Sequence, residues 1–157
     1  MTSIVLKPMT KNQFNSYVSQ EIKRYAMENV NAGYWPRKDS IKMSKEAHEQ
    51  LIPQGLSTKG HFFFCIYDRD DRKIGYIWFA IIRRPRTREA FIYDFFIIKR
   101  YRGKGMGRMT LEEASREARK LSASKLSLHV FAHNSVAKAL YEKVGFSVDS
   151  MNMSKRI

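Results

Sequence analysis

Residues 91–108 read FIYDFFIIKRYRGKGMGR, an apolar run followed by a turn that has three glycines at alternate positions. Glycine lets the backbone turn tightly and brings bare N–H groups close to a ligand. A helical pattern from about Gly105 to Leu121 follows, and its first turn would add unpaired donors and a positive dipole end. Five basic side chains among residues 99–108 supply countercharge. The stretch therefore predicts a strand, a phosphate-binding turn and a helix, a site suited to a polyphosphorylated small molecule.

The segments on either side extend this unit into a mixed sheet. Period-two patterns upstream, separated by polar turns, predict an antiparallel meander of three strands, His61–Asp68, Ile74–Ile82 and Glu89–Ile98. The downstream strand Lys125–Phe131 follows the helix, so a right-handed crossover makes it parallel to the Glu89–Ile98 strand. The other expected elements are an edge strand Ser3–Met9, helices Lys11–Asn31, Ser40–Leu51 and Ser135–Val144, and a last strand or hairpin within Phe146–Ile157.

These elements predict an α/β fold of the mixed α+β kind. We expect a central, twisted, mostly antiparallel sheet of six to seven strands, with about four helices on both faces and one parallel pair at the fourth and fifth strands. No repeat or low-complexity linker interrupts residues 1–157, so a single domain is expected.

Composition is typical of a cytoplasmic protein with a packed core, since 43% of the residues are hydrophobic. No apolar run approaches the roughly 18 residues of a membrane span, and no secretory leader is recognised. Cys65 is the only cysteine, which excludes an internal disulfide and is compatible with a reducing compartment. We expect it to be a buried small hydrophobe.

The net charge of +14 is unevenly distributed. Residues 1–78 carry 12 basic and 8 acidic groups, or +4, whereas residues 79–157 carry 17 and 7, or +10. Positive potential therefore gathers in the half that holds the glycine turn, where it would attract a nucleotide or a nucleic acid backbone equally well. A well-solvated basic surface is the alternative interpretation, and the arginines at 83, 84, 86 and 88 are expected to form a solvated hairpin tip.

Two common phosphate-binding loops are excluded by spacing. The P-loop pattern GxxxxGK[ST] is absent from the chain. The dinucleotide pattern GxGxxG also fails, because position 108 is Arg, and residues 123–127 contain no acid that could hold a ribose. A Walker-type nucleotidase and a Rossmann oxidoreductase are therefore not expected.

The turn does match RxxGxG, as RGKGMG at residues 102–107, and a second motif, NSVAKALYEKVGF, follows at residues 134–146. In these two motifs, over about residues 74–146, the chain resembles the GNAT superfamily of acetyl-CoA-dependent N-acetyltransferases. The resemblance implies a diphosphate of coenzyme A held by the turn and the first helical residues. These are Arg102, Gly103, Lys104, Gly105, Met106, Gly107 and Arg108.

The resemblance also implies roles along the rest of the cofactor. The strand end, Phe96, Ile97 and Ile98, would pair with the pantetheine arm and polarise the thioester carbonyl. Asn134 would contact the cofactor, and Tyr141 would protonate the departing thiolate. Each of the last two has a structural alternative, because Asn134 is a good N-cap and Tyr141 lies on an apolar helical stripe.

Candidate residues for the acceptor side are less clearly marked. Asp94 interrupts a strand that is apolar on both faces, so it serves either in catalysis or amine binding or as the structural partner of an arginine. Glu28 shares a helix face with Glu21 and could attract a cationic amine, or it could be a solvated charge. Tyr34 and Trp35 line an acceptor cleft or anchor their loop. The four histidines lack the spacing of a zinc site, so no metal is expected.

The expected function is transfer of an acetyl group from acetyl-CoA to a primary amine, by direct attack in a ternary complex that does not use Cys65. A small amine is favoured over a protein acceptor because of the strong positive charge. A second copy of the chain is one expected partner, whereas a membrane or nucleic acid is not. The alternative function is a basic RNA- or ribosome-associated binding protein with a vestigial or sensory CoA site, although no RNP-like, KH or helix-turn-helix signature is present.

Overall fold

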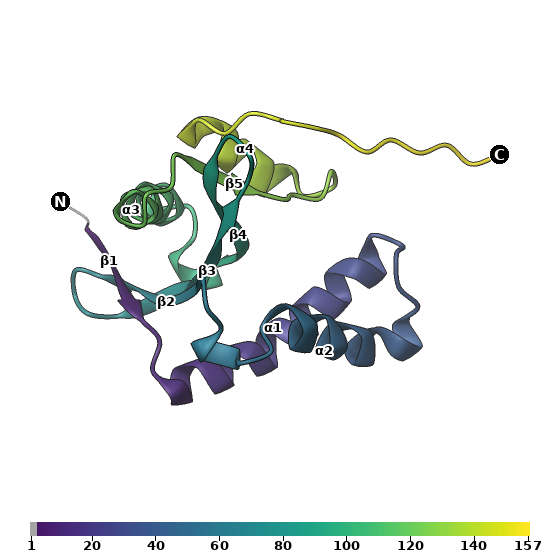
Figure 1. Ribbon diagram of the computed structural model, residues 1–157, viewed down its shortest axis with the longest axis horizontal. Coiled ribbons are helices and arrows are strands. Elements are labelled where there is room, and N and C mark those ends of the chain that lie inside the picture. Colours follow the sequence, from purple (N-terminus) through teal and green to yellow (C-terminus); the bar gives the residue numbers. More distant parts are fainter. Residues whose placement is uncertain (1–2) are drawn as a thin grey trace.

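The computed structural model describes residues 3–157 and has a mixed α/β architecture built on one sheet (Figure 1). The strands follow one another in chain order across the sheet, antiparallel except for the last pair, which is parallel. They are β1 Ile4–Pro8, β2 His61–Asp68, β3 Lys73–Arg83, β4 Arg88–Ile97 and β5 Lys125–Leu128. The predicted fold class and the parallel pair are confirmed, but the described residues form five strands and not six or seven.

Local capping signals set where the helices begin and end. Thr10 and Gln13 form a reciprocal capping box at the start of the first helix, and the Asn134 side chain accepts a hydrogen bond from the Ala137 N–H at the start of the last. Gly145 ends that last helix with φ 110°. The helices are α1 Lys11–Asn31, α2 Ser40–Leu51, α3 Met106–Lys120 and α4 Ser135–Val144, with short 3₁₀ turns at Arg37–Asp39, Gly55–Ser57 and Lys99–Tyr101.

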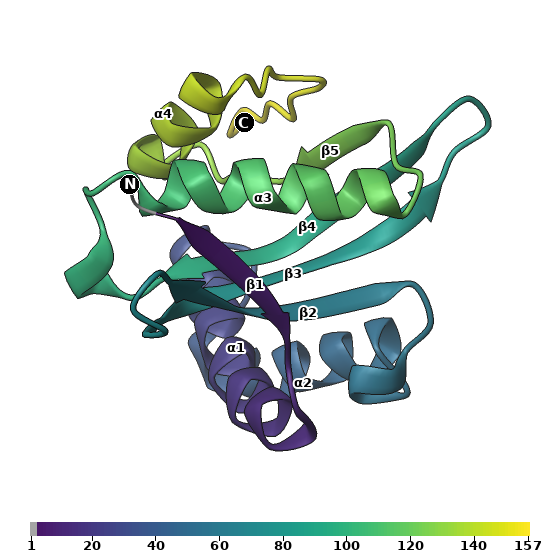
Figure 2. The ribbon, with the colours of Figure 1, turned by 90° about the vertical axis from the view of Figure 1, so that its left-hand side faces the viewer.

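The sheet separates two apolar clusters, as Figure 2 shows by placing α1 and α2 on one face and α3 and α4 on the other. Alternate residues of β2 show the division, because Phe64 and Ile66 face α3 while Phe63 and Cys65 face α1. Cys65 is fully buried, as expected. Helices therefore cover both faces, as the sequence predicts.

Two sequence predictions about the end of the chain are wrong. The strand expected to run to Phe131 ends at Leu128, where β5 loses its pairing with β4. Residues 146–157 form no strand or hairpin. Phe146 and Asp149 still contact the domain, and the chain beyond them extends away from the rest of the molecule (Figure 1). A strand needs a neighbour for its hydrogen bonds, and this segment has none within its own chain among the described residues.

Candidate active site

The two parallel strands, the last pair of the sheet among the described residues, separate part-way along their length. Pairing between β4 and β5 stops at Ile92 and Leu128, although β4 continues to Ile97. From Tyr93 onward, β4 is therefore paired on its β3 side only. The edge that faces away from β3 carries backbone groups that can bind an extended ligand.

A β-bulge decides which backbone groups lie on this open edge. The register shifts at Tyr93, because Phe79 pairs with Ile92 and the next residue of β3, Trp78, pairs with Asp94. Beyond the bulge, the Ile98 N–H donates to the Ile74 carbonyl at 2.8 Å. Since backbone groups alternate along a strand, the N–H groups of Phe96 and Ile98 face β3, and those of Phe95 and Ile97 face the gap.

The residues expected to bind the cofactor, Phe96, Ile97 and Ile98, do not all face the open edge. Only Ile97 of these directs its N–H to the open edge, and its carbonyl on the same side accepts a hydrogen bond from Arg102 Nε at 2.7 Å. The Phe95 N–H also faces the open edge, although the sequence did not single this residue out. The run FIYDFFII at residues 91–98 contains no Gly or Pro that would signal a bulge, so no local feature could have identified Phe95.

The glycine turn presents an open concave backbone. Gly103 and Gly105 have φ values of 73° and 78°, and a Cβ built on either would meet no atom within 4 Å. Gly105 is the N-cap of α3 and makes no side-chain cap, so the first-turn N–H groups of Met106, Gly107 and Arg108 have no acceptor from a capping side chain. Exposed Arg102 and Lys104 flank this cradle. The geometry fits a diphosphate.

Gly107 has a packing role as well. A Cβ at this position would lie 3.0 Å from Leu140 Cδ2 and 3.7 Å from Phe95 Cζ. The missing side chain therefore lets α3, α4 and β4 meet beside the gap. Tyr141, the residue after Leu140, consequently lies on the stretch of α4 that approaches the open edge.

Tyr141 is partly buried against Phe146, with ring centroids 5.7 Å apart. Burial raises its pKa to about 12, and the negative charges of Asp94 and Glu28 contribute to the shift. The phenol therefore keeps its proton at neutral pH and can donate it.

An acidic cluster, formed by Asp94 and Glu21 around Arg24, lies on the face of the sheet that α1 covers. Asp94 Oδ2 accepts hydrogen bonds from the Tyr17 hydroxyl at 2.7 Å and from Arg24 at 3.1 Å, and Arg24 also donates to Glu21 at 2.9 Å. Burial, together with the charge of Asp94, raises the pKa of Glu21 to about 9, with Arg24 opposing the shift. The arginine that pairs with Asp94 comes from α1, and neither Arg24 nor Tyr17 was identified from the sequence.

Phe96 connects this cluster to the glycine turn. Its ring lies 4.5 Å from the Arg24 guanidinium carbon and 5.2 Å from that of Arg102. Both guanidinium groups are thus in cation–π contact with the same ring. The Phe96 side chain therefore contacts both the acidic cluster, through Arg24, and the glycine turn, through Arg102.

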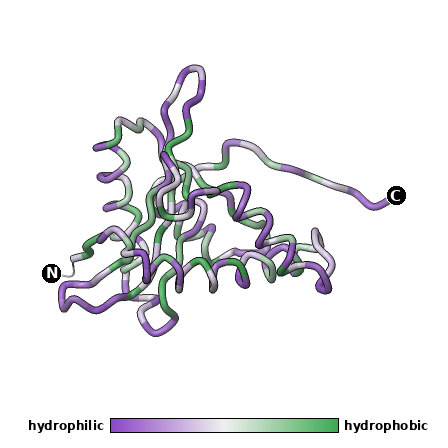
Figure 3. Tube along the Cα trace, turned by 60° about the horizontal axis from the view of Figure 1, so that its bottom comes forward, coloured by the Kyte–Doolittle hydropathy of each residue, from purple (hydrophilic) through white to green (hydrophobic). Residues whose placement is uncertain are grey.

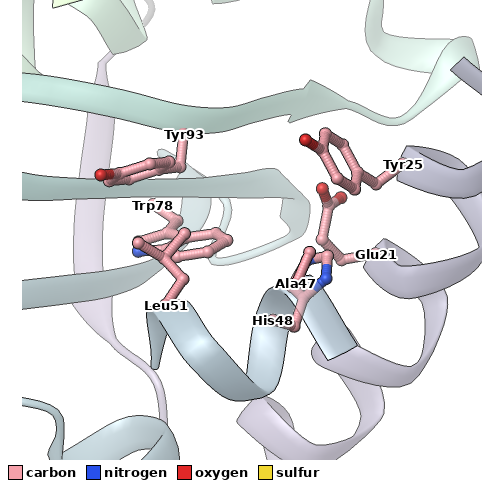
Figure 4. Close-up of a pocket in the computed structure, with 7 residues that line it drawn as sticks. All are labelled: Glu21, Tyr25, Ala47, His48, Leu51, Trp78 and Tyr93. Carbon is pink, nitrogen blue, oxygen red and sulfur yellow. The ribbon is translucent and has the colours of Figure 1, made fainter. Parts of the chain in front are cut away.

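Next to the cluster is a cavity of about 110 Å³ between two helices and the sheet (Figure 4). Trp78 and Tyr93 stack at 4.9 Å along one side, and the Glu21 carboxyl group points in beside Tyr25. His48 Nδ1 donates to the Ser44 carbonyl at 2.8 Å, and burial lowers the pKa of this histidine. The neutral ring therefore keeps Nε2 as an acceptor. The complete lining is Glu21, Tyr25, Ala47, His48, Leu51, Trp78 and Tyr93.

The remaining sequence candidates lie around these features. Glu28 is at the surface, yet the surrounding protein desolvates its carboxyl group enough to raise its pKa, and Asp94 raises it further. Tyr34 is 68% exposed, and its ring lies 6.2 Å from Phe131 in the loop after β5. Trp35 packs edge-on against Tyr25 at 5.4 Å, which anchors the loop.

Asn134 caps α4 through a 3.3 Å hydrogen bond, the structural role that the sequence allowed. Over residues 3–157, no three His, Cys, Asp or Glu side chains are grouped so that they could hold a metal ion. No helix in the same range has the length and apolar character needed to cross a bilayer.

Comparison with known proteins places this fold in a known family. The model of the acetyltransferase (GNAT) family matches residues 24–146. Two relatives from Bacillus subtilis (strain 168) align over 155 residues, or 99% of both chains in each case: the uncharacterized N-acetyltransferases YycN, 39% identical, and YdgE, 32% identical. The crystal structure of YycN superposes with a TM-score of 0.93 over 99% of each chain. The chain therefore belongs to the acetyltransferase (GNAT) family of acyl-CoA-dependent enzymes.

Proposed function

We propose that the protein transfers an acetyl group from acetyl-CoA to the nitrogen of a small primary amine by direct attack in a ternary complex. The observation that carries the proposal is the separation of β4 from β5 beyond Ile92, with the glycine turn at one end of the gap and Tyr141 beside it. Residues 1–157 act as a single domain, and the enzyme works in the cytoplasm.

The cofactor end of the site is built from main-chain donors. The diphosphate of acetyl-CoA binds the N–H groups of residues 103–108, and Arg102 and Lys104 supply positive charge. The pantetheine arm lies along β4, where the Phe95 and Ile97 N–H groups pair with it. A donor on this edge stabilises the negative charge that develops on the thioester oxygen.

Tyr141 is the general acid of the proposed reaction. The thiolate of coenzyme A leaves when the carbon–sulfur bond breaks, and the Tyr141 hydroxyl supplies its proton. The raised pKa of this phenol, about 12, matches the role because the group stays protonated until a strong base forms beside it.

The amine approaches from the α1 side of the sheet. Only a neutral amine attacks, so a proton must leave the nitrogen, and Asp94 accepts it directly or through water. Glu21 does not compete for that role, since its pKa of about 9 keeps it protonated at neutral pH. Glu28, on the same helix face, attracts the cationic form of the acceptor. Tyr34, in the loop after α1, covers the entrance from its position beside Phe131.

A small acceptor is favoured over a protein by size and charge. The cavity of about 110 Å³ holds only a small group. The net charge of +14 repels basic polypeptides.

Two measurements test the proposal. Isothermal titration calorimetry with acetyl-CoA and with desulfo-CoA should show binding, and a panel of amines should give products heavier by one acetyl group in mass spectrometry. An absence of binding heat on folded protein would refute it. Salt-sensitive RNA binding without acetyl-CoA binding would favour the alternative of a basic RNA-associated protein.

A further inference from the structure

The cavity of about 110 Å³ shares part of its wall with the acidic cluster. Glu21 lines the cavity and is hydrogen-bonded to Arg24, which in turn is the partner of Asp94. Consecutive residues of a strand normally face opposite sides of the sheet. At the bulge of β4, however, Tyr93 lines the cavity while the next residue, Asp94, accepts a hydrogen bond from Tyr17 on the same face. The cavity therefore lies beside the carboxylate that is proposed to receive the amine proton.

The wall of the cavity is mainly apolar. The Trp78 and Tyr93 rings stack along one side, and Tyr25, Leu51 and Ala47 complete the apolar part of the lining (Figure 4). Figure 3 shows that the hydrophobic stretches of the chain gather toward the middle of the molecule, whereas the outer loops are mostly hydrophilic. Ala47 leaves space because its side chain is a single methyl group. Such a wall favours the burial of an apolar group.

Three polar groups of the lining are engaged within the protein. Trp78 Nε1 donates to His61 Nδ1 at 3.1 Å, and the Glu21 carboxyl group accepts from Arg24 at 2.9 Å. His48 Nδ1 donates to a carbonyl of its own helix at 2.8 Å. The raised pKa of Glu21, about 9, and the lowered pKa of His48 leave both groups neutral at pH 7. Neither therefore supplies a charge that would attract an ammonium group into the cavity.

Size and shape favour a single aromatic ring as the guest. An apolar cavity of roughly 150 Å³ holds one benzene molecule, and this cavity has about 110 Å³. A flat ring can also pack on the wall that Trp78 and Tyr93 form, since aromatic rings attract one another in offset and edge-on arrangements. One ring therefore uses both the space and the wall.

We infer that the cavity binds the side chain of the acceptor, and that the acceptor is a primary amine with one aromatic ring on a short alkyl linker, such as 2-phenylethylamine. The inference rests on the proposed function and adds to it the class of amine. The ring packs against Trp78 and Tyr93, and the linker carries the amino group to Asp94. A diamine of similar length is disfavoured, because its second ammonium group would lose its hydration among uncharged walls.

NMR of the ¹⁵N-labelled full chain, without any CoA, tests binding apart from catalysis. The probes are 2-phenylethylamine, ethylamine and 1,4-diaminobutane at one pH, and the signal is the Trp78 Nε1–H, assigned with the variant Trp35→Phe. We expect 2-phenylethylamine to shift this signal with a dissociation constant at least about tenfold below those of the other two amines. Equal constants would overturn the inference. Tighter binding of 1,4-diaminobutane would also overturn it, because the cavity would then take a cation.

A variant that fills the cavity tests whether the ring binds there. Ala47→Leu adds three carbon atoms to the lining, and Gln50→Leu, at an exposed position of α2 outside the lining, is the matched control. We expect Ala47→Leu to weaken the binding of 2-phenylethylamine by more than about tenfold and Gln50→Leu to leave it within about twofold. Circular dichroism establishes that both variants are folded. Unchanged binding in folded Ala47→Leu would overturn the inference.

Initial rates with acetyl-CoA separate this inference from the proposed function. The ratio of kcat/KM for 2-phenylethylamine to that for ethylamine should fall about tenfold in Ala47→Leu and stay within about twofold in Gln50→Leu. Acetylation of both amines with equal kcat/KM by the natural chain would overturn the inference and leave the proposed function standing. If no amine is acetylated although 2-phenylethylamine shifts the Trp78 signal, the proposed function fails and the cavity is still a site for an aromatic ring.

Discussion

The Tyr17 hydroxyl donates a hydrogen bond of 2.7 Å to Asp94 Oδ2, joining two residues that lie 77 positions apart in the chain. Tyr17 is 1% exposed, so its hydroxyl is satisfied by this carboxylate inside the protein. This hydrogen bond links α1 to β4 next to the bulge. It thereby fixes the orientation of the carboxylate proposed to receive the amine proton.

Replacing Tyr17 with Phe should lower the free energy of unfolding by about 1–3 kcal/mol, because the partly buried carboxylate of Asp94 loses a donor. Urea denaturation measures the change. Tyr25→Phe is the matched control, since Tyr25 contacts Trp35 and His48 through its ring, and it should change the same quantity by less. Equal effects in the two variants would contradict the importance of the Asp94 contact.

Stability should fall as pH rises because of Glu21. Its pKa is about 9 in the folded protein and near 4.5 when exposed, so the folded state binds the extra proton between these values. The contribution of this group is fully present below pH 4.5 and declines as the pH rises toward 9. Glu21→Gln mimics the protonated acid and should flatten the profile. Urea titrations from pH 5 to 9 test this, and parallel profiles for the two proteins would refute it.

Tyr141→Phe should reduce kcat by about 100-fold because the leaving thiolate loses its proton donor. The ring contact with Phe146 remains, so the dissociation constant for acetyl-CoA should stay within about twofold of the original. Steady-state kinetics and calorimetry measure the two quantities. An unchanged kcat would remove Tyr141 from the mechanism.

Gly105→Ala should weaken acetyl-CoA binding by more than about tenfold, since a Cβ enters the cradle and strains a left-handed residue. Gly33→Ala is a close control, because Gly33 has φ 79° and equally open surroundings but lies in the loop after α1. Both changes should cost about 1 kcal/mol of stability. Calorimetry then separates strain, which the two share, from the loss of binding that only Gly105→Ala should show.

Cys65→Ala should leave kcat unchanged within about twofold. The side chain is fully buried on β2, and burial raises the pKa of its thiol, so no nucleophilic thiolate is available. Initial-rate measurements check the expectation. Recovery of an acetylated Cys65 peptide from the working enzyme would instead indicate an acyl-enzyme.

Local features of the chain were sufficient to predict most of the elements. The bounds of α1, α2 and α4 follow from the Thr10 capping box, from apolar periodicity and from Gly145 at the end of α4. Such signals act within a few residues and require no distant partner. The glycine turn before α3 and the Asn134 cap were recognisable for the same reason, and their two motifs carried the family resemblance.

The tertiary structure alone decided what those elements place together. The bulge at Tyr93 depends on how β3 and β4 pair, and it turns Asp94 toward Tyr17 and Arg24 and the Phe95 N–H toward the gap. The absence of a last strand has a similar cause, because residues 151–157 have no strand to pair with among residues 3–157. Periodicity determines which segments can be helix or strand, whereas register and pairing arise between residues far apart in sequence, and these set the geometry of the site.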